Sequence, residues 1–171
     1  KEAIKLGQVV GGSIGPTGKI LMMGDVTEEE LYQAFSEQAV ALSNGGADLI
    51  IIETMSALDE SLAAIRAIKE NTYLEIISSF TFEKTPSGEF RTMMGTNPID
   101  MVGEAIKAGA NIVGTNCGNG LENMIPIVKE IHTSFPDIPI LVNANAGIPQ
   151  LQNGKTVFPE SPEEMAGYIP K

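Results

Sequence analysis

The chain has 171 residues, of which 43% are hydrophobic and 19% are charged, and its formal net charge is −11. This length suits one domain with a sizeable core, and this composition is typical of a soluble globular protein rather than a disordered one. The negative charge repels nucleic acid backbones and anionic lipid, so neither is expected as a partner. No stretch approaches the roughly 20 apolar residues that a membrane helix requires.

The first residues lack the apolar segment and the cleavage site of a secretory signal peptide. The single cysteine, Cys117, cannot form an internal disulfide, so nothing indicates an oxidising compartment. We therefore expect a cytoplasmic protein.

Strand-like and helix-like segments alternate along the whole chain. Apolar or β-branched runs predict strands at residues 8–14, 48–54, 73–82, 111–117 and 138–144. Amphipathic segments predict helices at residues 28–44, 58–70, 98–109 and 121–132, and from residue 162 to the end of the chain. Three of these helices have N-terminal capping signals, which are Thr27 with Glu30, Asn97 before Pro98, and Ser161 with Glu164.

This order of elements predicts a parallel sheet with right-handed crossovers. Two architectures fit it, an open doubly wound sheet or part of a (β/α)₈ barrel, which needs eight units and about 250 residues. Similar helix-to-strand turns, GGAD at residues 45–48 and AGAN at residues 108–111, are typical of repeated βα units. An incomplete barrel would leave sheet edges and apolar faces open, so association or oligomerisation of the chain is expected.

Polar groups follow most of the predicted strands, at the edge where parallel sheets bind ligands. Glu53 follows three isoleucines, where it would bind a substrate ammonium, act as a base, or pair with a neighbouring cation or loop amide. Asn143 and Asn145 are predicted to alternate along a strand and so to share a face. There they would either support the next loop or orient a substrate.

Cys117 lies in GTNCGNG (residues 114–120), where a buried strand is predicted to end and a helix to begin. Free cysteines are most often small buried hydrophobes, but a helix N-terminus favours a thiolate, which is a nucleophile and a metal ligand. Zinc needs three or four ligands, whereas the chain has no second cysteine and only one histidine, His132. His132 is predicted near the end of a helix, where a cation suits the helix dipole, so we expect it to be structural.

Several motifs follow one another along the chain. They are GSIGPTG (residues 12–18), ADLIIIET (residues 47–54), SFTF (residues 79–82), GTNCGNG, NANAGIPQ (residues 143–150) and NGKTVFP (residues 153–159). Taken together and in this order, they resemble the homocysteine S-methyltransferase family. The resemblance extends over nearly the whole chain and is closest to the cobalamin-dependent members of the family. It implies a (β/α)₈ TIM barrel, of which residues 1–171 would form a single incomplete domain. About strands three to seven would be present, and the first units and the last unit would be missing.

The resemblance also implies a reaction, the transfer of a methyl group to the thiol of homocysteine to give methionine. Zinc bound by three cysteines would activate that thiol by lowering its pKa. Cys117 matches one of these ligands, and the other two, an adjacent pair, would lie beyond residue 171, so the fragment alone is expected to be inactive. Glu53 would bind the amino group of homocysteine, and Asn116, Asn143 and Asn145 would shape the site.

The methyl donor implied by the resemblance is methylcobalamin, with betaine and S-methylmethionine as alternatives. The chain has no Asp-x-His-x-x-Gly motif for binding cobalamin, so a corrinoid would have to be carried by another domain or protein. Two other functions compete with methyl transfer. One is a non-catalytic partial barrel that binds a small amino acid, and the other is an unrelated barrel enzyme with Glu53 as its base.

Overall fold

The computed structural model describes residues 7–118 and 120–169, and its main feature is one parallel sheet. Five strands lie in the spatial order β1-β2-β3-β6-β7. Their bounds are Gly11–Ile14 (β1), Leu49–Met55 (β2), Glu75–Phe80 (β3), Ile112–Cys117 (β6) and Ile140–Ala144 (β7). The helices that connect them are Glu28–Asn44 (α2), Leu58–Asn71 (α3), Pro98–Ala108 (α4) and Gly120–Ser134 (α5). The predicted α/β class is confirmed.

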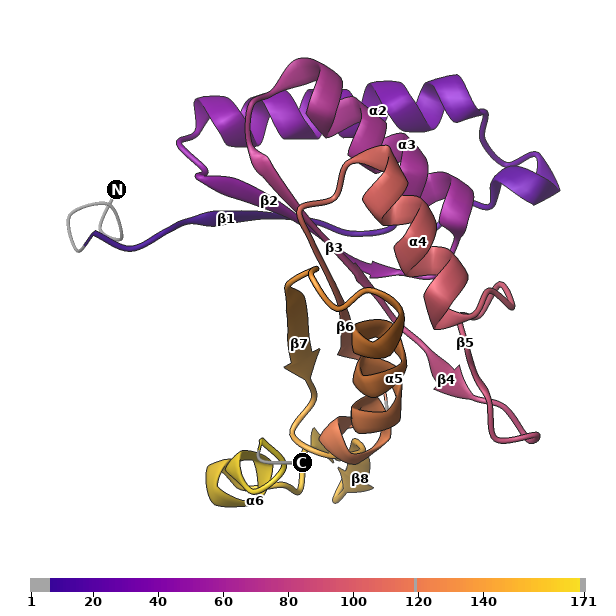
Figure 1. Ribbon diagram of the computed structural model, residues 1–171, viewed down its shortest axis with the longest axis vertical. Helices are drawn as coiled ribbons and strands as arrows, with labels where there is room; N and C mark the ends of the chain where they lie inside the picture. Colours follow the sequence, from indigo (N-terminus) through magenta and orange to yellow (C-terminus); the bar gives the residue numbers. More distant parts are fainter. Residues whose placement is uncertain (1–6, 119, 170–171) are drawn as a thin grey trace.

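The direction in which the sheet winds distinguishes the two predicted architectures. A doubly wound sheet reverses its strand order at one point, which places helices on both faces. Here the spatial order of the strands is the order of the chain, with no reversal. The connecting helices lie along one side of the sheet (Figure 1). The structure therefore has the winding of a barrel wall.

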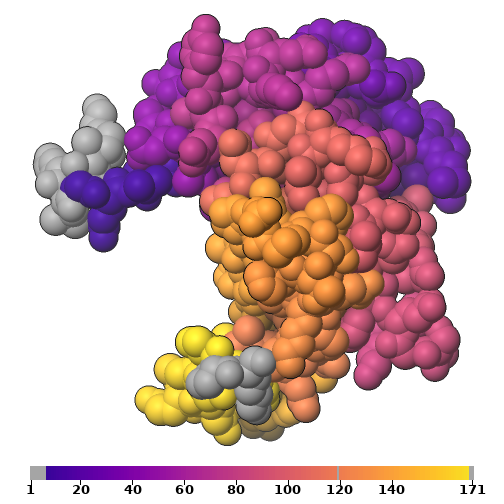
Figure 2. Space-filling view, viewed as in Figure 1, coloured from indigo at the N-terminus to yellow at the C-terminus, as the bar shows by residue number. Residues whose placement is uncertain are grey.

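The two faces of the sheet differ in what covers them. One face packs against the helices through alternate residues that are at most 2% exposed, which are Ile14, Ile50, Ile52, Ile76 and Val113. The opposite face carries the intervening residues of each strand, for example Ile51, which pairs in register with Ile77. Figure 2 shows the molecule curving around an open recess on this side, which we call the recess face.

All three predicted helix caps are confirmed. Thr27 and Glu30 form a capping box at α2, in which the Glu30 carboxylate accepts a hydrogen bond from the Thr27 amide at 2.8 Å. This bond holds the pKa of Glu30 below its usual value. Asn97 caps α4, and Ser161 with Glu164 forms the second capping box, at α6 (Pro162–Ala166).

The sequence did not predict several short elements. They are a 3₁₀ turn η1 (Leu21–Met23) and two small hairpins, β4 (Glu83–Lys84) with β5 (Phe90–Arg91) and β8 (Gln150–Gln152) with β9 (Lys155–Val157). Each of these strands has two or three residues, which is too short for a hydrophobic alternation to be recognised. Three predicted strands are shorter than expected by two or more residues, since β1 begins at Gly11, β3 spans Glu75–Phe80 and β7 begins at Ile140. The last predicted helix is also shorter, because α6 ends at Ala166; the end of that prediction, residues 170–171, lies outside the described residues.

Two further observations bear on association and on membranes. Among the described residues, β1 and β7 are the edge strands of the main sheet, and the expected association of the isolated chain stays a prediction. No helix in the described ranges combines the length and the apolar character needed to span a bilayer.

A substitution at Gly114 in β6 can test how closely β6 and β7 approach each other. A Cβ atom at this position would lie 2.1 Å from the carbonyl oxygen of Leu141 in β7, so Gly114→Ala must displace a strand backbone. We expect the free energy of unfolding to fall by about 3 kcal/mol in urea denaturation. Gly15→Ala is the control, because no atom lies within 4 Å of the added Cβ, and it should change stability by less than about 0.5 kcal/mol. Equal stability of the two variants would contradict the described packing.

Candidate functional site

Polar side chains from all five strands share the recess face at the carboxyl ends of the strands. Side chains along a strand alternate between the two faces of the sheet. Each of these polar residues is an even number of positions from an apolar or glycine residue of the recess face, so it lies on the recess face as well. Asn116 lies directly opposite Asn143 in the β6–β7 pairing. The set consists of Ser13, Glu53, Ser79, Asn116 and Asn143.

Glu53 lies half-buried on β2 and is held by a hydroxyl group. Its Oε1 accepts a hydrogen bond from the Oγ of Ser13 on the neighbouring strand β1. No salt bridge within residues 7–118 and 120–169 involves Glu53, so the cation partner considered from the sequence is not found there. A carboxylate that is oriented by a hydroxyl group is suited to bind an ammonium group.

Asn116 is the most highly connected side chain at this edge and is 2% exposed. Its Oδ1 accepts hydrogen bonds from the backbone N–H of Thr54 at 2.9 Å and from the Oγ of Ser79 at 2.7 Å. Its Nδ2 donates to the Oγ1 of Thr54 at 2.7 Å and lies 3.3 Å from the Sγ of Cys117. The side-chain amide is thereby satisfied within the chain, and it joins the ends of β2, β3 and β6.

Two residues bonded to Asn116 have unusual backbone conformations. Thr54 has a φ of 64° and Cys117 a φ of 58°, a region that residues other than glycine seldom adopt. Such conformations cost about 1–3 kcal/mol each and persist where surrounding contacts hold them. Here the side-chain amide of Asn116 bonds both residues. The backbone carbonyl of Asn116 in turn accepts a hydrogen bond from the Oγ1 of Thr81 at 3.1 Å.

Cys117 is a free, partly exposed thiol at the end of β6. As predicted, a helix begins just after it, because α5 starts at Gly120, and His132 lies in the last turn of α5. Within the described part of the chain, no group of three His, Cys, Asp or Glu side chains is placed to bind a metal ion. A thiolate is a ligand that zinc prefers, but these residues alone do not supply a complete zinc site.

Of the two asparagines near the end of β7, one lies as the sequence predicts and the other does not. Asn143 is exposed on the recess face, as expected for that strand position. Asn145 lies one residue beyond the end of β7, outside the strand along which it was predicted to alternate with Asn143. The chain turns there, with the amide of Gly147 bonded to the carbonyl of Asn145, and the Nδ2 of Asn145 donates to the carbonyl of Gly118 at 3.3 Å. Asn145 therefore supports the loop that follows Cys117.

Some contacts at the site join residues that are far apart in the chain, so no short sequence pattern predicts them. The residues that make these contacts are Ser13, Thr54 and Ser79. Thr54 and Asn116, for example, are separated by 62 positions in the chain. The only signal in the sequence is that these hydroxyl-bearing residues lie in or next to the predicted strand ends.

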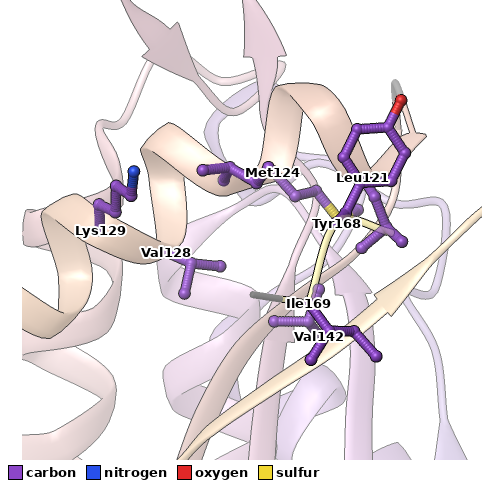
Figure 3. Close-up of a pocket in the computed structure, with 8 residues that line it drawn as sticks. Leu121, Met124, Val128, Lys129, Val142, Tyr168 and Ile169 are labelled. Carbon is purple, nitrogen blue, oxygen red and sulfur yellow. The ribbon is translucent and has the colours of Figure 1, made fainter. Parts of the chain in front are cut away.

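A cavity of about 250 Å³ lies elsewhere, between α5, β7 and the segment at residues 168–169. Figure 3 shows side chains from these three parts around it. They are mostly apolar and comprise Leu121, Met124, Ile125, Val128, Lys129, Val142, Tyr168 and Ile169. None of the residues that the sequence analysis assigned to the site lines this cavity, so the strand ends remain the candidate site.

A parallel sheet with helices along one face and polar strand ends on the other belongs to the (β/α)-barrel class of proteins. The profile of the homocysteine S-methyltransferase family matches residues 1–171, and the chain belongs to this family. The resemblance stated from the motifs is thereby confirmed.

Two relatives of this chain are methionine synthases. The chain is 28% identical over 164 residues to methionine synthase of Mycobacterium tuberculosis and 27% identical to that of Mycobacterium leprae. Each match covers 91% of this chain but only 13% of the relative.

Solved structures of the family are also similar. The homocysteine methyltransferase MmuM from Escherichia coli has a TM-score of 0.68 in its apo form and 0.61 in its metallated form, at 25% identity. These matches cover 82% of this chain, which spans about half the length of MmuM.

Replacement of Asn116 tests its role in holding the strand ends. Asn116→Ala would leave the Thr54 amide and the Ser79 hydroxyl without their acceptor, and each unsatisfied buried group costs about 1–3 kcal/mol. We expect the free energy of unfolding in urea to fall by about 3 kcal/mol. Asn44→Ala, at the exposed end of α2, is the control and should change it by less than about 0.5 kcal/mol. Similar stabilities for both variants would show that the amide network contributes little.

Proposed function

We propose that the intact protein containing this chain transfers a methyl group to the thiol of homocysteine and so forms methionine. Membership of the homocysteine S-methyltransferase family and similarity to methionine synthases support this reaction. The structural observation that carries the proposal is the recess edge, where the oriented carboxylate of Glu53 precedes Thr54, and the amide of Asn116 contacts both Thr54 and the thiol of Cys117. Homocysteine carries an ammonium group, which a carboxylate would bind, and a thiol, which a metal ion at the site would bind.

In this proposal Glu53 binds the ammonium group of homocysteine. Ser13 uses its hydroxyl to hold one oxygen of the carboxylate, which orients the group before the substrate arrives. The Glu53 carboxylate is half-buried and has no salt-bridge partner among residues 7–118 and 120–169, so it would interact strongly with a substrate cation, because the surroundings are less polar than water. Asn143, which faces the recess, would contact the substrate, whereas Asn116 and Asn145 would shape the site by holding the Cys117 loop.

Zinc is the proposed cofactor, and Cys117 would supply one of its three cysteine ligands. The donor type fits zinc, but the number does not, since the described residues offer no second or third ligand beside Cys117. The remaining ligands would have to come from elsewhere in the intact protein. The existence of a metallated form of the relative MmuM supports a metal in this family.

The methyl donor in this proposal is methylcobalamin, carried by another domain or protein. The methionine synthases that match this chain extend far beyond the matched segment, which leaves room for such domains in the relatives. We further propose that residues 1–171 correspond to about strands three to seven of the barrel, and that the intact protein is cytoplasmic. Coverage of half of MmuM and the two edge strands β1 and β7 support the partial barrel.

Glu53→Gln separates substrate binding from base catalysis. If Glu53 binds the homocysteine ammonium, loss of its charge should raise the Kd for homocysteine at least about tenfold, or about 1.4 kcal/mol, in calorimetry on the intact protein. Glu83→Gln, at an exposed glutamate of β4, should leave the Kd unchanged. An unchanged Kd together with a large loss of kcat in Glu53→Gln would instead support the alternative barrel enzyme with Glu53 as its base.

Cys117→Ser tests the zinc proposal. The variant of the intact protein should lose most of its bound zinc, measured by mass spectrometry of the metal after dialysis, because a serine hydroxyl is a far poorer zinc ligand than a thiolate. His132→Gln is the control and should retain the zinc, since His132 lies in the last turn of α5. Equal zinc in Cys117→Ser and the unmodified protein would exclude Cys117 as a ligand.

A further inference from the structure

Glu60 is a buried carboxylate that the proposed reaction does not use. It lies in the first turn of α3 and is 4% exposed. Its Oε1 accepts two hydrogen bonds from one residue, from the backbone N–H of Thr17 at 2.7 Å and from the Oγ1 of Thr17 at 2.6 Å. Within the described ranges no salt bridge involves Glu60. The carboxylate is therefore held by Thr17 and by its place at a helix N-terminus, where negative charge is favoured.

Thr17 belongs to the GSIGPTG motif, and the proposed reaction gives a role to Ser13 of this motif but none to Thr17. Residues 15–19 are all exposed, so no buried side chain within this segment fixes it to the core. The segment is instead fixed by polar contacts at Thr17, whose Oγ1 also accepts a hydrogen bond from the amide of Lys19 at 3.2 Å. The contact with Glu60 is thus the anchor of the loop that follows β1.

The end of β1 and the segment from β2 to α3 are joined a second time, at the proposed ammonium site. Ser13 on β1 donates to Glu53 on β2, and four residues later Thr17 donates to Glu60, seven residues beyond Glu53. The two contacts connect the end of β1 to β2 and to the helix that follows it. Ser13 and Ile14 are paired with β2, whereas residues 15–19 lie beyond the strand, so loss of the second contact would release the loop that directly follows the Ser13 end of β1.

We propose that Glu60 is a positioning residue of the homocysteine site, which acts through Thr17 to fix the loop after β1 and so the Ser13–Glu53 pair. This inference rests on the proposed function. It requires that loss of the Glu60–Thr17 contact weakens the binding of homocysteine and leaves the methyl transfer step unchanged. Since ammonium binding and methyl transfer involve different groups, a rise in KM without a fall in kcat distinguishes positioning from general loss of structure.

The test uses the intact protein and four variants. Thr17→Val removes the hydroxyl and keeps the size and the backbone N–H, Thr17→Ser restores the hydroxyl, and Glu60→Gln removes the charge. Glu70→Gln is the matched control, because Glu70 lies on the same helix and also accepts a hydroxyl hydrogen bond, from Tyr32 at 2.7 Å, at the other end of α3. We expect Thr17→Val and Glu60→Gln to raise the homocysteine KM about tenfold with kcat changed less than twofold, and Thr17→Ser and Glu70→Gln to match the unmodified protein.

Amide hydrogen exchange of the segment at residues 15–20 gives a second measurement that does not depend on activity. It should accelerate in Thr17→Val and Glu60→Gln and not in the other two variants. Faster exchange with an unchanged KM would show that the contact holds the loop but does not position the site, and would overturn the inference. An unchanged exchange rate would overturn it as well. If the unmodified protein neither binds nor methylates homocysteine, the proposed function is refuted. The inference that Glu60 positions a homocysteine site is then refuted with it. Thr17 is exposed, so Thr17→Val keeps the test available if Glu60→Gln does not fold.

Discussion

The side-chain amide of Asn116 is the constraint on which the geometry of the candidate site depends. It connects three strands in a buried setting, where an unpaired donor or acceptor costs about 1–3 kcal/mol. Displacement of any one of these strand ends would therefore break bonds at the others. The two residues with positive φ, Thr54 and Cys117, are both bonded to this amide, so the network also holds the backbone that directs the thiol. The position of Cys117 is thus a property of the paired sheet and not of a loop.

Local signals explain what could be predicted from the sequence. The apolar runs and the caps at Thr27, Asn97 and Ser161 depend on neighbours within a few residues, and they identified the five strands of the main sheet and the helices. Glu53 and Cys117 were placed at strand ends for the same reason. The resemblance assigned Asn116 to the site, but its hydrogen bonds were not predictable, because its partners Thr54 and Ser79 are 62 and 37 positions away. The small hairpins were missed because their strands are too short to show a period.

The recess face combines two kinds of surface that act together. Its lower layer is apolar, as in the row that contains Ile51, Ile77 and Ile112, and its upper layer holds the polar strand ends. An apolar layer beneath a polar rim lowers the local dielectric constant, which strengthens the interaction of Glu53 with a cation. The high negative charge of the whole chain acts in the same direction, because it attracts cations and disfavours other anions at the rim.

The unreversed strand order has a consequence for how such a site changes over time. Each βα unit adds one strand to the wall and one set of side chains to the rim, in the same order as in the gene. A substitution or an insertion after one strand therefore alters one sector of the rim and leaves the order and the pairing of the other strands unchanged. The hairpins after β3 and β7 are additions of this kind, since both extend loops without interrupting the sheet. A wall built in this way can acquire a new specificity sector by sector while its fold stays the same.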